Sequence, residues 1–156
     1  RMPYRMHTEY LHRLFLRNSL ASARYLVGSR PVSLSDIDVP ICAVGTLTDH
    51  VAPWRSVYKI IPLTDTEVTF ILTSGGHNAG VVSPPGSPNR SYQLAVHRHD
   101  DPYIDPDRWV GRVPQVEGSW WPAWDGWLER HAGKHVPPPA PMPAAAAAPG
   151  DYVLQQ

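Results

Sequence analysis

The chain has 156 residues and a mass of 17.4 kDa, which is enough for one ordinary domain. Its 14 Lys and Arg residues balance 14 Asp and Glu residues, and no basic stripe indicates nucleic-acid binding. A single cysteine, Cys42, excludes a disulfide framework and a zinc cluster built from cysteines. No apolar run reaches the length of about 18 residues that indicates a transmembrane helix.

The N-terminal sequence differs from a secretory signal peptide, because charged residues are spread through residues 1–18. The chain also begins with Arg1 rather than Met. We therefore expect the sequence to be a fragment of a longer protein.

The first elements expected along the chain are a helix and a hairpin. Apolar residues at helical spacing predict a helix over residues 4–18. Residues 23–27 and 32–34 are expected to form two short strands, joined by a turn at residues 28–31.

A strand–helix–strand pattern follows. The apolar run at 39–45 predicts a buried strand of a parallel sheet, and Pro53 favours a helix over 53–61 that Pro62 would stop. Residues 67–73 give the clearest strand, because β-branched and aromatic residues dominate it. This order predicts an α/β fold, since parallel strands need such a crossover. Two convincing parallel strands are too few for a complete doubly wound sheet, which is a second indication of a fragment.

The C-terminal third has a less regular pattern. Residues 92–97 are expected to form a last strand, and residues 120–131 a short helix with tryptophans on one side. Residues 136–150 are rich in proline and alanine and predict an extended linker. Residues 151–156 form a small tail.

Two polar residues follow the predicted parallel strands. Asp49 comes after the first strand and His77 after the second, within a loop that contains Gly75, Gly76 and Gly80. Active groups of open α/β sheets lie just beyond the carboxyl ends of strands. If the strands are neighbours, Asp49 can accept the imidazole Nδ1–H of His77 and leave Nε2 as a general base. The alternatives are a solvated turn histidine and an aspartate that caps a helix.

A nucleophile for this pair is missing from the sequence. Neither G-x-S-x-G nor G-x-C-x-G occurs, although an α/β-hydrolase presents its nucleophile in such an elbow, ahead of the acid and the base. Cys42 lies inside an apolar strand, where a thiol is usually inert. The nucleophile is therefore expected to lie outside this chain.

Other chemical groupings give weaker signals. A metal site would need further spaced ligands besides the group His97, His99, Asp100 and Asp101, so an exposed polar turn is the preferred interpretation. The tryptophans at 120–127 are interpreted as packing residues of a helix rather than as a ligand site.

Several motifs in order resemble the poly(3-hydroxyalkanoate) synthases, most closely the class I type, poly(3-hydroxybutyrate) polymerase. The matching segments are Met2–Leu11, Gly45–Trp54, Thr66–Phe70, Ser74–Gly80 and Gly118–Trp124. The resemblance covers nearly the whole chain apart from the proline- and alanine-rich segment. It implies that residues 1–21 form the end of a cap region that covers the substrate. Residues 22–135 would form the C-terminal part of an α/β-hydrolase catalytic domain.

The same resemblance implies a Cys-His-Asp triad in which Asp49 and His77 are the acid and the base. His50 would line the site, no metal or other cofactor is expected, and the chain alone would be inactive. The implied activity is the polymerisation of 3-hydroxyacyl-coenzyme A into polyester, in the cytoplasm at the surface of polyester granules. A homodimer of the parent enzyme is compatible with it. Two alternatives stay open, namely a thioesterase or esterase fragment and a non-catalytic truncated copy.

Overall fold

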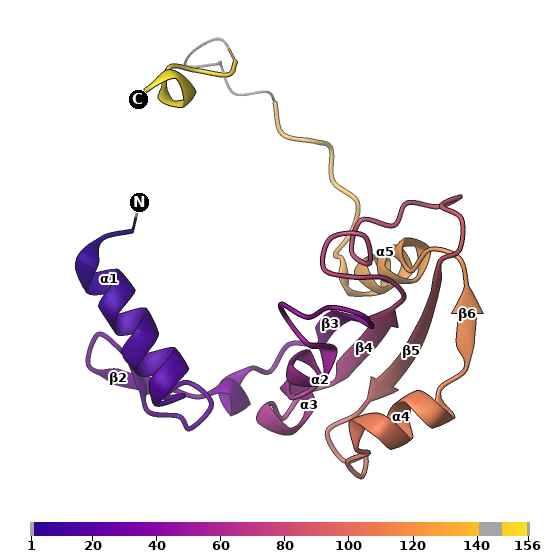
Figure 1. Cartoon of the computed structure of the whole chain (residues 1–156), viewed down its shortest axis with the longest axis horizontal. Coiled ribbons are helices and arrows are strands. Elements are labelled where there is room, and N and C mark those ends of the chain that lie inside the picture. Colours follow the sequence, from indigo (N-terminus) through magenta and orange to yellow (C-terminus); the bar gives the residue numbers. More distant parts are fainter. Residues whose placement is uncertain (1, 141–147, 156) are drawn as a thin grey trace.

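A four-stranded sheet with the order β3-β4-β5-β6 forms the centre of the fold (Figure 1). We describe it from a computed structural model, which covers residues 2–140 and 148–155. The pair β3 and β4 is parallel, whereas β5 is antiparallel to β4 and β6 is antiparallel to β5. The strands are β3 (Ile41–Thr46), β4 (Val68–Thr73), β5 (Ser91–His97) and β6 (Gln115–Glu117).

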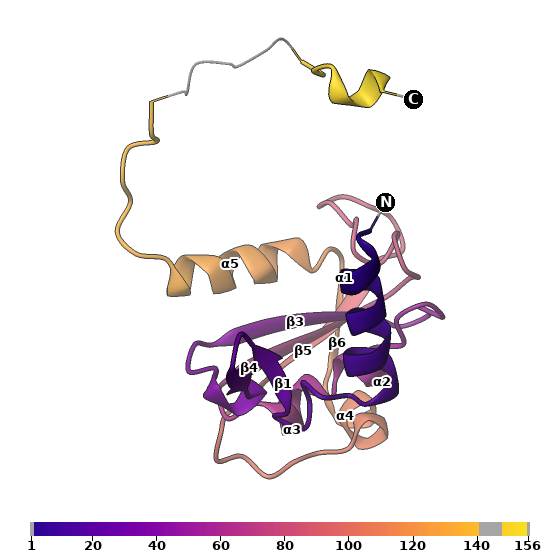
Figure 2. The same ribbon diagram turned by 90° about the vertical axis from the view of Figure 1, so that its left-hand side faces the viewer.

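Helices flank this sheet on both faces, as Figure 2 shows with the sheet nearly edge-on. On one side lies α5 (Trp121–His131), and on the other side lie α2 (Trp54–Val57), α3 (Ile60–Leu63) and α4 (Pro106–Arg112). The predicted α/β class is therefore confirmed, with a mixed rather than a purely parallel sheet.

The core lies between the sheet and helices α2, α3 and α4. All six residues of β4 are buried, and alternate side chains of a strand point to opposite faces of the sheet. The face toward these helices carries a cluster of buried apolar side chains. Full burial of one such side chain stabilises the folded chain by about 1.5–3 kcal/mol. Its members are Trp54, Tyr58, Ile61, Val68, Phe70, Leu72 and Trp109. This packing fixes β4 and with it the start of the loop that contains His77.

The N-terminal elements lie beside the sheet (Figure 1). The predicted helix over 4–18 is observed as α1 (Tyr4–Glu9), continued by a π-helix, η1 (Tyr10–Leu16). The predicted hairpin is formed by β1 (Tyr25–Val27) and β2 (Arg30–Val32). Its turn is shorter than expected, because Arg30 and Pro31 already pair with β1.

Two predicted elements need correction. The helix expected over 53–61 is two short helices, and Pro62 lies inside α3, in a first turn that needs no backbone N–H there. The strand expected to be buried, β3, lies at one edge of the described sheet and is fully buried only at Gly45 and Thr46. The helix expected over 120–131 is observed as α5, in which Trp124 and Leu128 remain 39% exposed.

The sequence prediction missed helix α4 and strand β6, and the C-terminal segment is covered only in part. Asp105 caps α4 by accepting the backbone N–H of Arg108 at 3.0 Å, and Pro106 occupies its first turn. Part of the predicted linker, residues 141–147, lies outside the described residues, as does residue 156 of the tail. Residues Tyr152–Leu154 form a short 3₁₀ turn, η3. Within the described ranges no helix combines the length and the apolar character that crossing a bilayer requires.

Candidate active site

Asp49 and His77 lie on the two loops that follow β3 and β4. These strands are parallel neighbours, and Thr46 and Thr73 are paired at their ends, so both loops leave the sheet at the same edge. The Nδ1 atom of His77 lies 2.8 Å from the Oδ2 atom of Asp49. The structure therefore brings the two predicted residues, 28 positions apart, into direct contact.

The Asp49 carboxylate is held by four hydrogen bonds. Its Oδ1 atom accepts the backbone N–H groups of Val51 and Ala52 at 2.8 and 2.9 Å. Its Oδ2 atom accepts the Thr46 hydroxyl at 3.2 Å and faces His77. The carboxylate thus also orders the turn before α2. The helix-capping role considered from the sequence is not observed, because Pro53 is the N-cap of α2 and no side-chain hydrogen bond caps this helix.

These bonds hold the pKa of Asp49 well below its usual range. The Ala52 N–H has the largest effect, burial of the carboxylate opposes it, and the bonds from His77, Val51 and Thr46 lower the pKa further. Asp49 is therefore ionised at neutral pH.

The charge of Asp49 fixes the tautomer of His77. An ionised carboxylate can only accept hydrogen bonds, so the proton between the two residues belongs to Nδ1 of the imidazole. The Nε2 atom of the neutral ring then carries a lone pair. The His77 side chain is 51% exposed, which leaves the ring accessible to a reacting group. This arrangement suits a general base.

The backbone of the loop after β4 depends on glycine close to His77. Gly75 has a φ of +99°, a conformation that residues with a Cβ rarely adopt. The loop can therefore turn sharply after Thr73 and present the histidine at the edge of the sheet.

The remaining predicted residues lie elsewhere. His50 is exposed on the loop beside Asp49. Cys42 is half-buried within β3, and burial raises the pKa of its thiol, so it stays protonated and poorly nucleophilic.

The group of His97, His99, Asp100 and Asp101 lies at the other end of the strands. His97 pairs with Val68 at the start of β4, opposite to the end that carries Asp49 and His77. Asp101 accepts the backbone N–H of Arg98 at 2.8 Å and so closes a turn. In residues 2–140 and 148–155, no three His, Cys, Asp or Glu side chains gather as a metal site would require.

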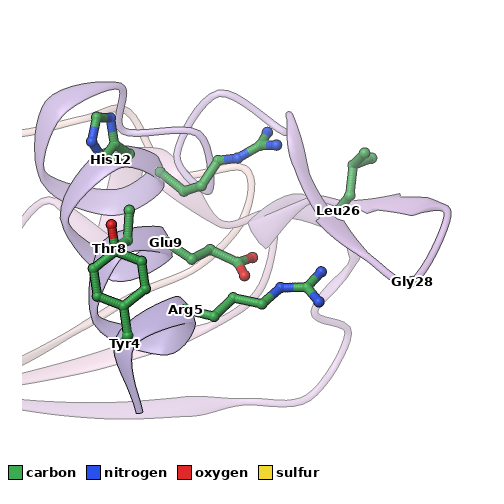
Figure 3. A pocket seen from close by; sticks show the side chains of 8 residues that line it. Tyr4, Arg5, Thr8, Glu9, His12, Leu26 and Gly28 are labelled. Atoms are coloured by element: carbon green, nitrogen blue, oxygen red, sulfur yellow. The ribbon is translucent and has the colours of Figure 1, made fainter. Parts of the chain in front are cut away.

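A cavity of about 820 Å³ lies between α1 and the β1–β2 hairpin. Figure 3 shows Arg5 and Glu9 extending from the helix toward this hairpin, with Leu26 on the opposite wall. Neither Asp49 nor His77 lines this cavity. The candidate acid–base pair instead lies at the edge of the sheet.

Reasoning from the sequence missed Thr46. This buried threonine donates its hydroxyl to the same carboxylate oxygen that faces His77. A threonine at the end of a strand is common, so nothing in the sequence singled it out.

Comparison with known proteins relates the chain to one enzyme family. It is 37% identical to the poly(3-hydroxyalkanoate) polymerase subunit PhaC of Rhizobium meliloti (strain 1021), over 98% of the chain and 25% of that relative. It is 36% identical to the poly(3-hydroxyalkanoate) polymerase of Methylorubrum extorquens, over 98% of the chain and 26% of that relative. The PhaC subunit of Cupriavidus necator (strain H16) is 35% identical over 92% of the chain and 25% of its own length. The chain thus spans about a quarter of the length of these relatives, and no protein-family model matches it.

Proposed function

Because this chain is related over nearly its whole length to the poly(3-hydroxyalkanoate) polymerases, we propose that it supplies the acid and the base of such an enzyme. In this proposal the chain is the C-terminal part of an α/β-hydrolase catalytic domain, and the nucleophilic cysteine lies outside it. The parent enzyme polymerises 3-hydroxyacyl-coenzyme A into polyhydroxyalkanoate. The contact between Asp49 and His77 is the observation that carries the proposal.

The first step of the proposed reaction forms an acyl-enzyme. The Nε2 atom of His77 takes the proton of the cysteine thiol, and the thiolate attacks the thioester carbonyl of the substrate. The bond between the acyl carbon and the coenzyme A sulfur breaks. The imidazolium returns its proton to the departing coenzyme A thiolate, so His77 is neutral again. Asp49 stabilises the imidazolium during this step because it stays ionised.

The second step extends the polyester. His77 takes the proton of a 3-hydroxyl group, and the resulting oxygen nucleophile attacks a cysteine-bound acyl group. A new ester bond forms, the carbon–sulfur bond breaks, and the cysteine recovers its proton from His77. Asp49 can serve this step by orienting His77 or by acting on the 3-hydroxyl. We place the enzyme in the cytoplasm at the surface of polyester granules, with His50 lining the site.

A hybrid enzyme tests the proposed function. The matching quarter of the Rhizobium meliloti polymerase is replaced by this chain, and free coenzyme A is followed with 3-hydroxybutyryl-coenzyme A as substrate. We expect coenzyme A release and polymer from the hybrid, and no release above background from the 156-residue chain alone.

Three other outcomes of the hybrid experiment would contradict the proposed function. Free 3-hydroxybutyrate in place of polymer would point to a thioesterase. A hybrid that folds but releases no coenzyme A would point to a non-catalytic copy. Release by the isolated chain would refute the claim that the nucleophile lies outside it.

A further inference from the structure

The loop that carries His77, residues 74–83 (the His77 loop), has few regular backbone interactions of its own. It follows the buried strand β4 and contains only short turns, in which Gly80 and Val82 donate their N–H groups to the carbonyls of Gly76 and Asn78 at 2.8 Å. His77 is half-exposed and is held at its ring by Asp49. To hold the ring of His77 in one position, the backbone of the His77 loop therefore needs contacts with other parts of the fold.

Three consecutive residues just before and at the start of α5 supply such support. The indole N–H of Trp120 donates to the Gly80 carbonyl at 3.1 Å, and that of Trp121 donates to the Val81 carbonyl at 2.9 Å. The Ser119 hydroxyl donates to the Ser83 carbonyl. The side chains of 119–121 thus bind three carbonyls within four positions of the His77 loop.

The central bond of this set is buried. Trp120 is only 5% exposed, and the Gly80 carbonyl also accepts the hydroxyl of the buried Thr73 at 3.1 Å. A buried carbonyl without hydrogen-bond donors is unfavourable, because it has lost its contact with water. The Thr73 hydroxyl and the Trp120 indole N–H therefore both favour this one position of Gly80. Gly80 in turn packs against Thr46, whose hydroxyl binds Asp49. A continuous series of contacts therefore connects Trp120 with Gly80, Gly80 with Thr46, and Thr46 with Asp49.

We propose that Ser119–Trp121 is a latch that positions the His77 loop, with Trp120 as its principal positioning residue. The latch acts through the backbone and does not touch the reacting groups. It keeps the imidazole within hydrogen-bonding distance of Asp49 and so maintains the Nδ1–H tautomer. The importance of this tautomer for catalysis rests on the proposed function, whereas the positioning itself does not.

The test observes His77 directly in the full 156-residue chain. Trp120→Phe removes the indole N–H but keeps an aromatic ring, and Trp121→Phe does the same at the exposed second bond. Trp124→Phe is the matched control, because Trp124 packs against Trp120 with ring centroids 5.7 Å apart but, among the described residues, makes no hydrogen bond to the His77 loop. Long-range ¹H–¹⁵N correlation spectra report the tautomer of His77 in each protein.

We expect the Nδ1–H tautomer to dominate in the unmodified chain and in Trp124→Phe. It should be lost in Trp120→Phe and in the double variant with Trp121→Phe, with the backbone amide signals of β3 and β4 unchanged. An unchanged tautomer in the folded double variant would overturn the proposal, as would an equal loss in Trp124→Phe. If Trp120→Phe disrupts the sheet, Trp121→Phe alone is measured. It should reduce the population of the Nδ1–H tautomer, and an unchanged population would overturn the proposal.

A second measurement separates this proposal from the proposed function. In the hybrid polymerase we expect Trp120→Phe to lower kcat for coenzyme A release and to leave KM unchanged. A change of tautomer in a hybrid that never releases coenzyme A would refute the proposed function and leave the latch intact. Unchanged kcat in an active hybrid, together with an unchanged tautomer, would refute the latch alone.

Discussion

Gly80 lies so close to Thr46 that a Cβ atom built on the glycine would be 2.5 Å from the Thr46 Cγ2 atom. The same Cβ would lie 2.9 Å from the Gly76 carbonyl oxygen. Only a glycine therefore fits between the strand that leads to Asp49 and the loop that carries His77. This contact couples the position of the candidate base to the threonine that binds the candidate acid.

We predict that Gly80→Ala destabilises the chain and separates the two loops. Overpacking of a close contact costs about 1–3 kcal/mol in the free energy of unfolding, which urea denaturation measures. Gly111→Ala is the control, because a Cβ there meets open space within α4. The control should be neutral or stabilise the chain by up to about 1 kcal/mol. Equal stability of the two variants would contradict the close approach of Gly80 to Thr46.

The hydrogen bonds to Asp49 predict a specific dependence on pH. The folded chain holds the pKa of Asp49 below the value of about 3.9 found in unfolded chains, chiefly through the Ala52 N–H. The stabilisation from ionised Asp49 is then fully present above that unfolded value and is lost as the pH falls through the folded pKa.

Denaturation of the native chain and of Asp49→Asn from pH 7 to pH 3 measures this contribution. The difference between the two free energies of unfolding should persist down to about pH 5 and shrink below about pH 4. A difference that is constant over the whole range would contradict the lowered pKa.

The thiol of Cys42 should react slowly in the folded chain. Burial raises its pKa and reduces the thiolate that attacks thiol reagents. A chromogenic disulfide at pH 8 should modify Cys42 much faster in urea than in the native chain. Cys42→Ala should leave coenzyme A release by the hybrid polymerase unchanged. Loss of release in that variant would instead make Cys42 a candidate nucleophile.

Local patterns were enough to predict the elements that position the candidate site. The β-branched run of β4 and the order strand–helix–strand predicted parallel strands. The structure shows that these strands are neighbours, which places Asp49 and His77 at one edge. Helix α4 was missed although Asp105 and Pro106 form a recognisable helix start.

Long-range contacts were beyond the reach of the sequence patterns. The bond between Trp120 and Gly80 joins residues 40 positions apart, and no spacing within either segment indicates it. The tryptophans were therefore interpreted as helix packing. Likewise, the antiparallel direction of β5 depends on the path of a proline-rich connection, which periodicity does not describe.

The aromatic core should account for much of the stability of the sheet. Phe70 is fully buried and makes edge-to-face contacts with Tyr58 and Trp109, at centroid distances of 4.9 and 5.2 Å. Phe70→Ala should lower the free energy of unfolding by about 3–5 kcal/mol. Phe15→Ala is the matched control, because Phe15 is 69% exposed, and its effect should stay within about 0.5 kcal/mol. Similar losses in both variants would contradict the location of the core.

The central claim is that Asp49 and His77 are the acid and the base of a polymerase, and replacing His77 in the hybrid polymerase tests it most directly. Removing a general base typically costs about 10²–10⁴-fold in rate. The control is His99→Ala, because His99 follows the end of β5 that pairs with the start of β4, away from the candidate site. We predict that His77→Ala lowers coenzyme A release from 3-hydroxybutyryl-coenzyme A by that factor, while His99→Ala releases it at the rate of the unmodified hybrid. Release by His77→Ala at the unmodified rate would contradict the account.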